Sequence, residues 1–254
     1  MKKTEITGVI LAKDESQNLK QAIKSLVFCK EVIVVDDNSS DDTKIVAMSL
    51  GARVLRHELS GDFAAQRNYA LSKATSPWVF FLDADEVVSS SLSQEITKAV
   101  ATDLFDGYKV QRQDYFCGKL LKFGETGNIV FLRLARKGNG IWHGVVHEEW
   151  KVNGKIGYLT YPLYHYPHPT VTTFLNKINW YTNILALAWQ RHGRKVHGWE
   201  IIVFPGGKFI ANYFWKLGFL DGTPGFIMAM MMSFHSFLVR AKLWLKLHPG
   251  NTHA

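Results

Sequence analysis

The sequence predicts an α/β fold, in which a mostly parallel sheet is flanked by helices and is followed by a helical, amphipathic C-terminal extension. Two observations predict the sheet: apolar runs without polar alternation, and helical patterns between successive runs. The extension is predicted by an aromatic, cationic C-terminal part. The 254 residues are 47% hydrophobic and 20% charged, which is enough apolar surface for a packed core and excludes a disordered chain.

The first 82 residues alternate between strand and helix patterns. Short apolar runs rich in β-branched residues predict strands over 5–12, 31–35, 52–55 and 78–82. Apolar residues at helical spacing predict helices over 18–28, 43–50 and 64–72. This order predicts parallel strands with both faces covered, and ligands bind beyond the carboxyl ends of such strands.

The cysteines, the N-terminus and the charge distribution narrow the class of protein further. Cys29 and Cys117 form no metal-binding or paired spacing, so we expect neither a disulfide framework nor a structural zinc site. The N-terminus has no sustained apolar run before Lys13, so we expect no secretory signal and a cytoplasmic chain. The net charge is +8, and the excess lies in residues 151–254, so we expect this part to face an anionic partner, either a membrane or a nucleic acid.

Acidic residues follow two of the predicted strands. Asp36 and Asp37 end one strand, and Asp83 and Asp85 end another. For the two acids and the hydroxyl of 41–43, helix capping explains the residues as well as a functional role does. Capping explains Asp83 and Asp85 less well, because two carboxylates one residue apart repel each other unless a cation or hydrogen-bond donors lie between them. A Mg²⁺ or Mn²⁺ ion that also binds a diphosphate would relieve this repulsion.

Four stretches in this order carry a family resemblance. They are Asp14-Glu15, VVDDNSSDDT at 34–43, GDFAAQRN at 61–68 and FFLDADE at 80–86. Together they resemble the family 2 glycosyltransferases, which have the GT-A fold. RLARKGNGIWHGVVHEEW at 133–150 and FLDGTPGF at 219–226 look like the branch that adds a sugar, including glucose, to the inner core of lipopolysaccharide. The resemblance implies a GT-A catalytic domain over 1–168, and 169–254 would form the helical extension.

The resemblance assigns roles to the acidic residues and to one arginine. Glu15 and one or both of Asp36 and Asp37 would bind the uridine of a UDP-sugar. Arg67 would lie near the nucleotide or its phosphates. Asp83 would lie near the sugar and ribose, and Asp85 would bind the divalent metal (Mg²⁺ or Mn²⁺). Asp14 stands where the family usually has Asn, so the contact at that position is open.

The resemblance also implies inversion at the anomeric carbon, which needs a base on the acceptor hydroxyl. We predict Glu148 as this base, with Glu149 as the rival, because neighbours on a strand face opposite ways and the sequence does not fix the phase. His147 would bind a phosphate oxygen or the metal. Alternatively, His147 or Glu149 is only a hydrogen-bonded strand residue. The predicted catalytic residues are therefore Glu148, Glu149 and Asp83.

The cationic C-terminal part has several interpretations. Residues 158–168 suit either sugar stacking or loop packing, and 172–190 predict a helix. The apolar stretch 226–239 is shorter than the roughly 20 residues of a membrane span. Its continuation to Lys246 fits a helix lying in an anionic membrane interface, or a helix that packs on the core or on a second copy. We expect the chain to be peripheral on the cytoplasmic face of the inner membrane.

The favoured function is transfer of a hexose, expected to be glucose, from a UDP-sugar to a hydroxyl of a lipopolysaccharide core acceptor. One alternative is a transferase that acts on polyprenyl phosphate. Another is a non-catalytic basic protein that binds nucleic acid or membrane, but we expect no nucleic acid, because the front half displays carboxylates. The sequence leaves open the donor sugar, the acceptor and linkage, and the oligomeric state.

Overall fold

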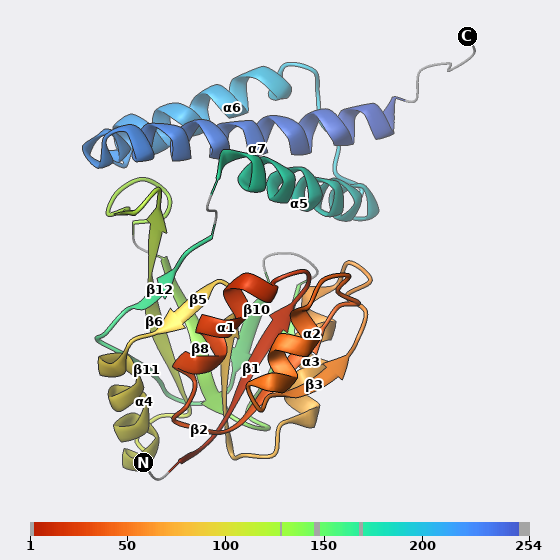
Figure 1. Cartoon of the computed structure of the whole chain (residues 1–254). Coiled ribbons are helices and arrows are strands. Elements are labelled where there is room, and N and C mark those ends of the chain that lie inside the picture. The colour runs from red at the N-terminus through yellow and green to blue at the C-terminus, as the bar shows by residue number, and fades with distance from the viewer. Residues whose placement is uncertain (1–2, 128, 145–147, 168–169, 249–254) are drawn as a thin grey trace. The chain divides into compact units, whose positions relative to one another are not determined.

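The computed structural model describes residues 3–127, 129–144, 148–167 and 170–248. The chain forms two compact units (Figure 1). The first contains residues 1–112 and 129–165, and the second contains 113–128 and 166–254. Residues 113–128 thus group with the helical unit, whereas they fall inside the predicted domain 1–168. The proposed boundary between 168 and 169 stays a prediction.

Four parallel strands form one half of the sheet in the first unit. They are β1 (Thr4–Ala12), β2 (Cys29–Asp36), β3 (Arg53–Arg56) and β4 (Trp78–Asp83), in the order β3-β2-β1-β4. Ala12 pairs with Asp36 and Leu11 pairs with Asp83, so the carboxyl ends of these strands meet at one edge. The predicted fold class is confirmed.

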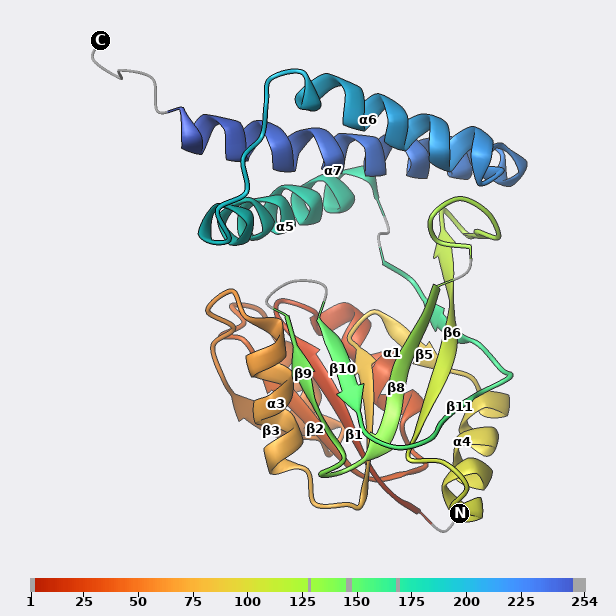
Figure 2. The same ribbon diagram turned by 180° about the vertical axis from the view of Figure 1, so that it is seen from behind.

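The other half of the sheet is largely antiparallel and was not predicted. β8 (Ile129–Arg136) pairs with β4, β6 (Gly107–Phe116) pairs with β8, and β12 (Leu163–His165) and β5 (Glu86–Val88) lie beyond. β11 (Ile156–Tyr158) also pairs with β6. β7 (Lys119–Leu120) pairs with the last residues of β6, Tyr115 and Phe116, which belong to the second unit. β9 (Gly140–His143) and β10 (Glu149–Val152) form a separate hairpin (Figure 2).

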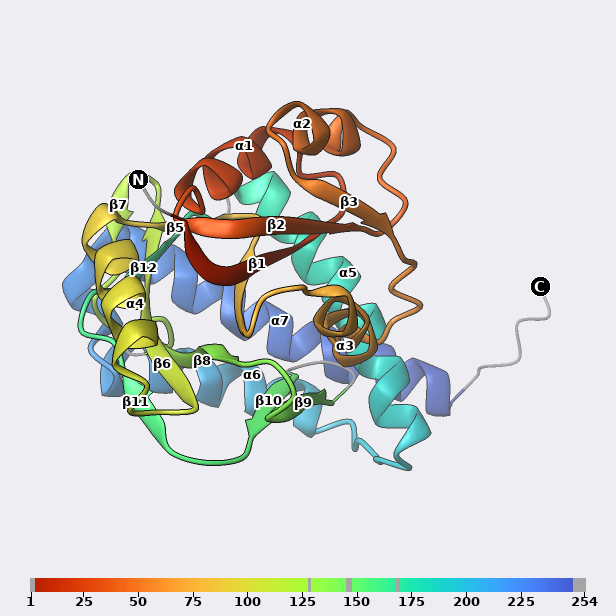
Figure 3. The same ribbon diagram turned by 90° about the horizontal axis from the view of Figure 1, so that it is seen from below.

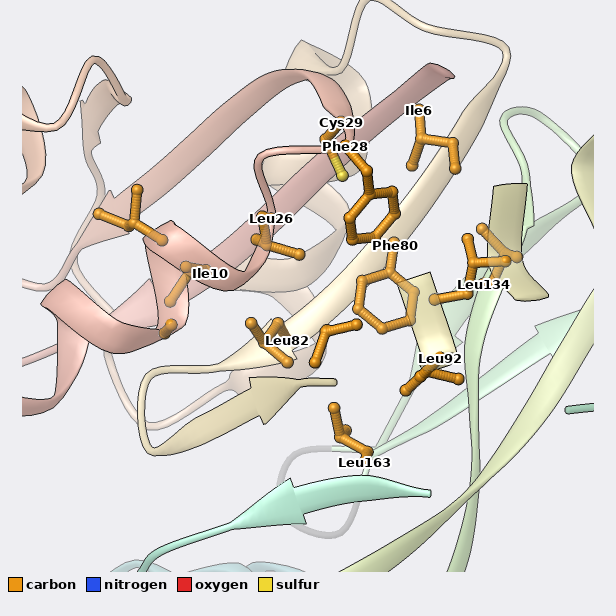
Figure 4. Close-up of a cluster of buried hydrophobic side chains, with 14 of the residues drawn as sticks. Ile6, Ile10, Leu26, Phe28, Cys29, Phe80, Leu82, Leu92, Leu134 and Leu163 are labelled. Atoms are coloured by element: carbon orange, nitrogen blue, oxygen red, sulfur yellow. The ribbon is translucent and has the colours of Figure 1, made fainter. Parts of the chain in front are cut away.

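Helices and the hairpin cover the two faces of the sheet. Buried side chains of α1 (Ser16–Ser25), α2 (Thr43–Ser49) and α4 (Ser90–Thr102) pack on one face, around Phe80 and Leu82 (Figure 4). α3 (Phe63–Lys73) and Trp142 and Trp150 of the hairpin pack on the other face, around Phe81. Successive residues of β4 therefore face opposite layers, as a strand buried on both faces requires.

The second unit is mainly helical. α5 (Val171–Arg191) is followed by α6 (Glu200–Ile210), the π-helical turn η1 (Ala211–Trp215), the 3₁₀ helix η2 (Gly218–Asp221) and α7 (Thr223–Leu247). α7 contacts both α5 and α6 (Figure 3). The Asp221 carboxylate accepts backbone N–H bonds from Lys122 and Phe123, which ties residues 113–128 to this unit. The helix predicted over 172–190 is confirmed.

α7 is longer than the apolar stretch 226–239 that the sequence analysis considered. It has 25 residues, and its length and composition would allow it to cross a membrane. The core helices of soluble proteins meet the same criterion. In this unit Met228 and Met231 are buried beside Phe174 and Ile178 of α5. Both methionines lie in the apolar stretch 226–239, so part of that stretch packs inside this unit, which was one of the alternatives given for it.

Candidate active site

The loops after β1 and β2 are joined by hydrogen bonds at the carboxyl edge of the sheet. The Asp14 carboxylate accepts hydrogen bonds from the backbone and the hydroxyl of Ser40, at 2.7 and 3.0 Å. The backbone N–H of Glu15 donates to the Thr43 hydroxyl at 2.8 Å, and the Glu15 carboxylate accepts from Asn18 at 2.7 Å. Glu15 is thereby placed beside the start of α2, next to the loop that follows Asp36.

Asp36 and Asp37 are both buried, but their surroundings differ. Asp37 accepts hydrogen bonds from Lys13 Nζ at 3.0 Å through one oxygen and from the backbone of Leu59 at 2.8 Å through the other. Asp36 accepts a longer bond of 3.3 Å from the backbone of Ser39. Asp37 therefore holds neighbouring loops together with both of its carboxylate oxygens.

Asp83 is at the centre of an ionic network. Arg133 of β8 donates to both of its carboxylate oxygens, at 2.6 and 3.3 Å, and Arg67 of α3 donates at 2.9 Å. Partial burial raises the pKa of a carboxyl group, but the two guanidinium groups outweigh this effect and hold the pKa of Asp83 well below its usual range. Asp83 is therefore a charged, oriented carboxylate.

Arg67 connects Asp83 to the loop before β10. Its Nε donates to Glu148 at 2.8 Å, and its guanidinium carbon lies 4.7 Å from the ring centre of Trp142. Arg67 is only 5% exposed, and its buried Nη1 makes no hydrogen bond within the described part of the chain. A buried guanidinium nitrogen in this position can bind an anionic ligand.

The two candidate bases lie in different surroundings. Glu148 is half-buried and pairs with Arg67, whereas Glu149 lies in β10 opposite His143 and is exposed. Among the described residues, the Arg67 and Asp83 cluster thus includes Glu148, and Glu149 is not among its ion pairs. His147 lies outside the described residues.

Asp85 faces a histidine that the sequence analysis did not single out. Its carboxylate Oδ1 lies 3.4 Å from Nε2 of His165, and both side chains are at most 11% exposed. The pairing of β12 with β5 produces this contact by placing His165 opposite Glu86. Within the described ranges, no cluster of three or more acidic, histidine or cysteine side chains is arranged to hold a metal.

Glu86 and Arg133 complete the site and were also missed. Glu86 is fully buried, accepts from Arg133 at 2.7 Å and accepts from the backbone of Asp83 at 2.9 Å. Burial raises the pKa of the Glu86 carboxyl, and the attraction of Arg133 offsets only part of this rise. The sequence did contain a signal for both: Glu86 is the seventh residue of FFLDADE and Arg133 is the first of RLARKGN, so each is a charged residue beside an apolar run.

The predicted residues thus fall into groups. Asp83, Arg67 and Glu148 form one ionic network, and Asp85 lies beside it in the chain. Glu15 and Asp36 lie at the adjacent loops, on the other side of β1 from Asp83. The carboxylate of Asp41 accepts hydrogen bonds from the backbone N–H groups of Thr43 and Ser16, so Asp41 joins the starts of α1 and α2.

Comparison with known proteins identifies the class. The sequence profile of Glycosyl transferase family 2 matches residues 8–153. This range contains the site residues described above, with the exception of His165. The chain is 30% identical to an uncharacterized glycosyltransferase, RP128, of Rickettsia prowazekii, over 94% of this chain and 86% of that protein. The chain therefore belongs to glycosyltransferase family 2.

The chain is also similar to one further curated protein and to one solved structure. The lipopolysaccharide core biosynthesis glycosyltransferase LpsC of Rhizobium meliloti is 29% identical over 95% of this chain and 93% of that protein. A crystal structure of glucosyl-3-phosphoglycerate synthase from Mycobacterium tuberculosis, with phosphoglyceric acid, matches with a TM-score of 0.49 and 18% identity, over 77% of this chain and 82% of that one.

Proposed function

We propose that this chain is an inverting transferase that moves a hexose, expected to be glucose, from a UDP-sugar to a hydroxyl of a lipopolysaccharide core acceptor. The observation that carries the proposal is the network in which Arg67 and Arg133 hold Asp83 and Glu148 at the carboxyl edge of the sheet. The similarity to LpsC over nearly the whole of both chains supports the choice of acceptor.

The donor would bind along the loops at this edge. Glu15 and Asp36 would accept hydrogen bonds from the base and ribose of uridine. Asp37 is the weaker candidate, because protein donors already occupy both of its oxygens. The buried Nη1 of Arg67 would donate to the diphosphate, since it makes no hydrogen bond in the described part of the chain. Asp83 would face the sugar and ribose, held in one orientation by its two arginines.

Glu148 would take the proton from the acceptor hydroxyl as that oxygen attacks the anomeric carbon, opposite the departing diphosphate. Its bond to Arg67 fixes the direction of the carboxylate before the acceptor arrives. The exposed position of Glu149 in β10 supports Glu148 over Glu149. The role of His147 at a phosphate oxygen or the metal stays a prediction.

A divalent metal fits the side chains at Asp85. The carboxylate of Asp85 and the imidazole of His165 lie 3.4 Å apart and would supply one oxygen and one nitrogen ligand, a combination that suits Mn²⁺. We propose that Asp85, with His165, holds this metal. A bound metal would neutralise negative charge on the leaving diphosphate. The protein residues named above would orient the UDP-sugar beside this metal.

A paired substitution tests the base. Glu148→Gln should lower turnover by about 10²–10⁴-fold, because general base catalysis contributes that much, while UDP binding stays the same. Glu149→Gln is the matched control and should stay within about threefold of the unchanged protein. Turnover is measured as UDP released with a panel of UDP-hexoses and purified lipopolysaccharide core acceptors. Normal turnover of Glu148→Gln would remove Glu148 from the mechanism, and no UDP release with any acceptor would refute the proposed function.

A further inference from the structure

The second unit exposes a large apolar surface along α6 and the two short helices that follow it. We call this the α6 surface. It consists of Trp199, Ile202, Val203, Phe204, Ile210, Phe214, Trp215, Leu217, Phe219 and Leu220, each at least 41% exposed. Trp215 is 85% exposed and Ile202 is 77% exposed. Soluble proteins rarely leave a contiguous apolar surface of this extent uncovered, so a partner is expected to cover it.

The opposite side of α6 is the one that packs. Glu200 and Pro205 of α6 are buried, and the carbonyl of Pro205 accepts a hydrogen bond from Ser233 of α7. On the outer side, a Cβ added to Gly206 or Gly207 would meet no atom within 4 Å. α6 therefore uses one face for the core of its unit and presents the other face outward.

The charges around the α6 surface are almost all positive. Arg191, Arg194 and Lys195 precede α6 and are exposed, and Lys216 is exposed beside Trp215. Residues 166–254 contain two acids, Glu200 and Asp221, and both are buried. Glu125 of the same unit pairs with Lys208 of α6 at 2.6 Å, so these two charges offset each other and the remaining exposed charges named above are positive. Lysine and arginine side chains at the edge of an apolar surface are attracted to anionic lipid headgroups.

Two arginines near this surface lie over the same aromatic ring, that of Trp189. The guanidinium carbon of Arg194 lies 3.6 Å from the ring centre of Trp189, and that of Arg240 lies 5.7 Å from the same centre. Arg240 is 8% exposed, and its Nε makes no hydrogen bond within the described residues. Burial lowers the pKa of Arg240, and the nearby Arg194 adds to this effect. Arg240 donates to Ser236 and lies near the buried Glu200, whereas Arg194 is exposed, so Arg194 is the cation of this pair that can reach a lipid phosphate.

We propose that the α6 surface docks the chain on an anionic lipid bilayer, where its aromatic side chains enter the interface and its basic residues contact lipid phosphates. A second copy of this chain is a poorer partner, because a two-fold contact would bring the same cations face to face. The inference deepens the proposed function, since it rests on a lipid-linked acceptor as the reason for docking. It also moves the membrane contact from α7, the predicted element, to α6.

Co-sedimentation of the full chain with vesicles tests the surface. We expect binding to phosphatidylcholine vesicles that contain phosphatidylglycerol, and much weaker binding to phosphatidylcholine alone. The triple variant Ile202→Ser, Phe214→Ser, Trp215→Ser should weaken binding by at least about tenfold, because it removes apolar area that enters the interface. The control variant Val27→Ser, Ile45→Ser, Leu104→Ser, with side chains 66–70% exposed on the first unit, should bind as the unchanged protein does.

A charge variant tests the basic residues separately. Arg194→Gln, Lys195→Gln, Lys216→Gln should weaken binding to the anionic vesicles by about 100-fold, since each charge near the surface contributes about a factor of five. Lys20→Gln, Lys24→Gln, Lys44→Gln removes three exposed charges from the first unit and should have little effect. Equal weakening by both charge variants would show non-specific attraction and would overturn the proposal.

Three other results would also overturn it. One is equal binding to neutral and anionic vesicles. A second is a concentration-dependent dimer that the apolar variant abolishes, which would assign the surface to a second copy. A third is retention on membranes after alkaline carbonate washing, which would favour insertion of α7. The proposed function is tested separately by measuring UDP binding in solution for every variant. If the unchanged protein binds anionic vesicles but does not bind UDP, the proposed function is refuted and the proposed docking surface is retained.

Discussion

Asp83 and Asp85 are one residue apart, yet their side chains have different partners. Asp83 receives hydrogen bonds from Arg67 and Arg133, and Asp85 lies beside His165. The repulsion between the two carboxylates is thus relieved on one side by two guanidinium groups of the protein itself. This separates their roles: Asp83 is oriented by the protein, and Asp85 remains the candidate for a metal.

Asp85→Asn should lower turnover by about 10²–10³-fold, because it removes the charge that would hold the metal beside the leaving group. The fold should be retained, since Asn has the same shape. Asp42→Asn is the matched control, because Asp42 is exposed and its side chain makes no capping hydrogen bond. UDP release over a range of Mn²⁺ concentrations measures the effect. Full turnover of Asp85→Asn would contradict the metal assignment.

The buried Glu86 makes stability depend on pH. Its pKa in the folded chain is raised above the ordinary value of 4.5, so the folded state binds its proton more tightly than the unfolded state does. The stabilisation from this group is present below pH 4.5 and is lost as the pH rises through the raised pKa. Glu86→Gln should therefore reduce the fall in melting temperature between pH 4.5 and pH 8. An unchanged pH profile in this variant would contradict the assignment.

At the scale of elements, the strands and helices of the first 83 residues follow from local pattern. β1, β2, β3 and β4 lie within three residues of the predicted bounds, because continuous apolar runs of β-branched and aromatic residues favour strands buried on both faces. Apart from the strand expected at Glu148 and Glu149, the strands after residue 85 were missed because several have only two to four residues, and because β6 and β8 mix charged residues with apolar ones. Their pairing supplies Arg133 and His165 to the site.

The first turn of α3 links an element to the site, because α3 carries Arg67. The Asp62 side chain caps this helix by accepting from the backbone of Ala65, and Ser89 caps α4 in the same way. Asp62→Ala and Ser89→Ala should each lower the free energy of unfolding by about 1 kcal/mol in urea denaturation. Turnover should fall only in Asp62→Ala, since α4 carries no site residue. Equal turnover in the two variants would show that capping of α3 does not position Arg67.

At the scale of the whole molecule, ligand binding should stabilise the folded chain. UDP with Mn²⁺ at about 100 times its dissociation constant adds about 2.7 kcal/mol, because the ligand binds the folded state only. The melting temperature should therefore rise with UDP and Mn²⁺, and the rise should be smaller for Asp85→Asn. Duplex DNA should produce no rise. A rise with DNA and none with UDP would favour the nucleic-acid-binding alternative.

The sequence by itself determined the α/β class, the parallel strands and the acids at their ends, because these depend on periodicity and on residues adjacent in the chain. Only the tertiary structure decided which of these residues meet. It brought Glu148 rather than Glu149 to Arg67, added Arg133 and His165 from antiparallel strands, and turned an apolar face of α6 outward while part of α7 was buried. Such contacts join residues up to 81 positions apart, and no local pattern encodes which side chains will face each other across that distance.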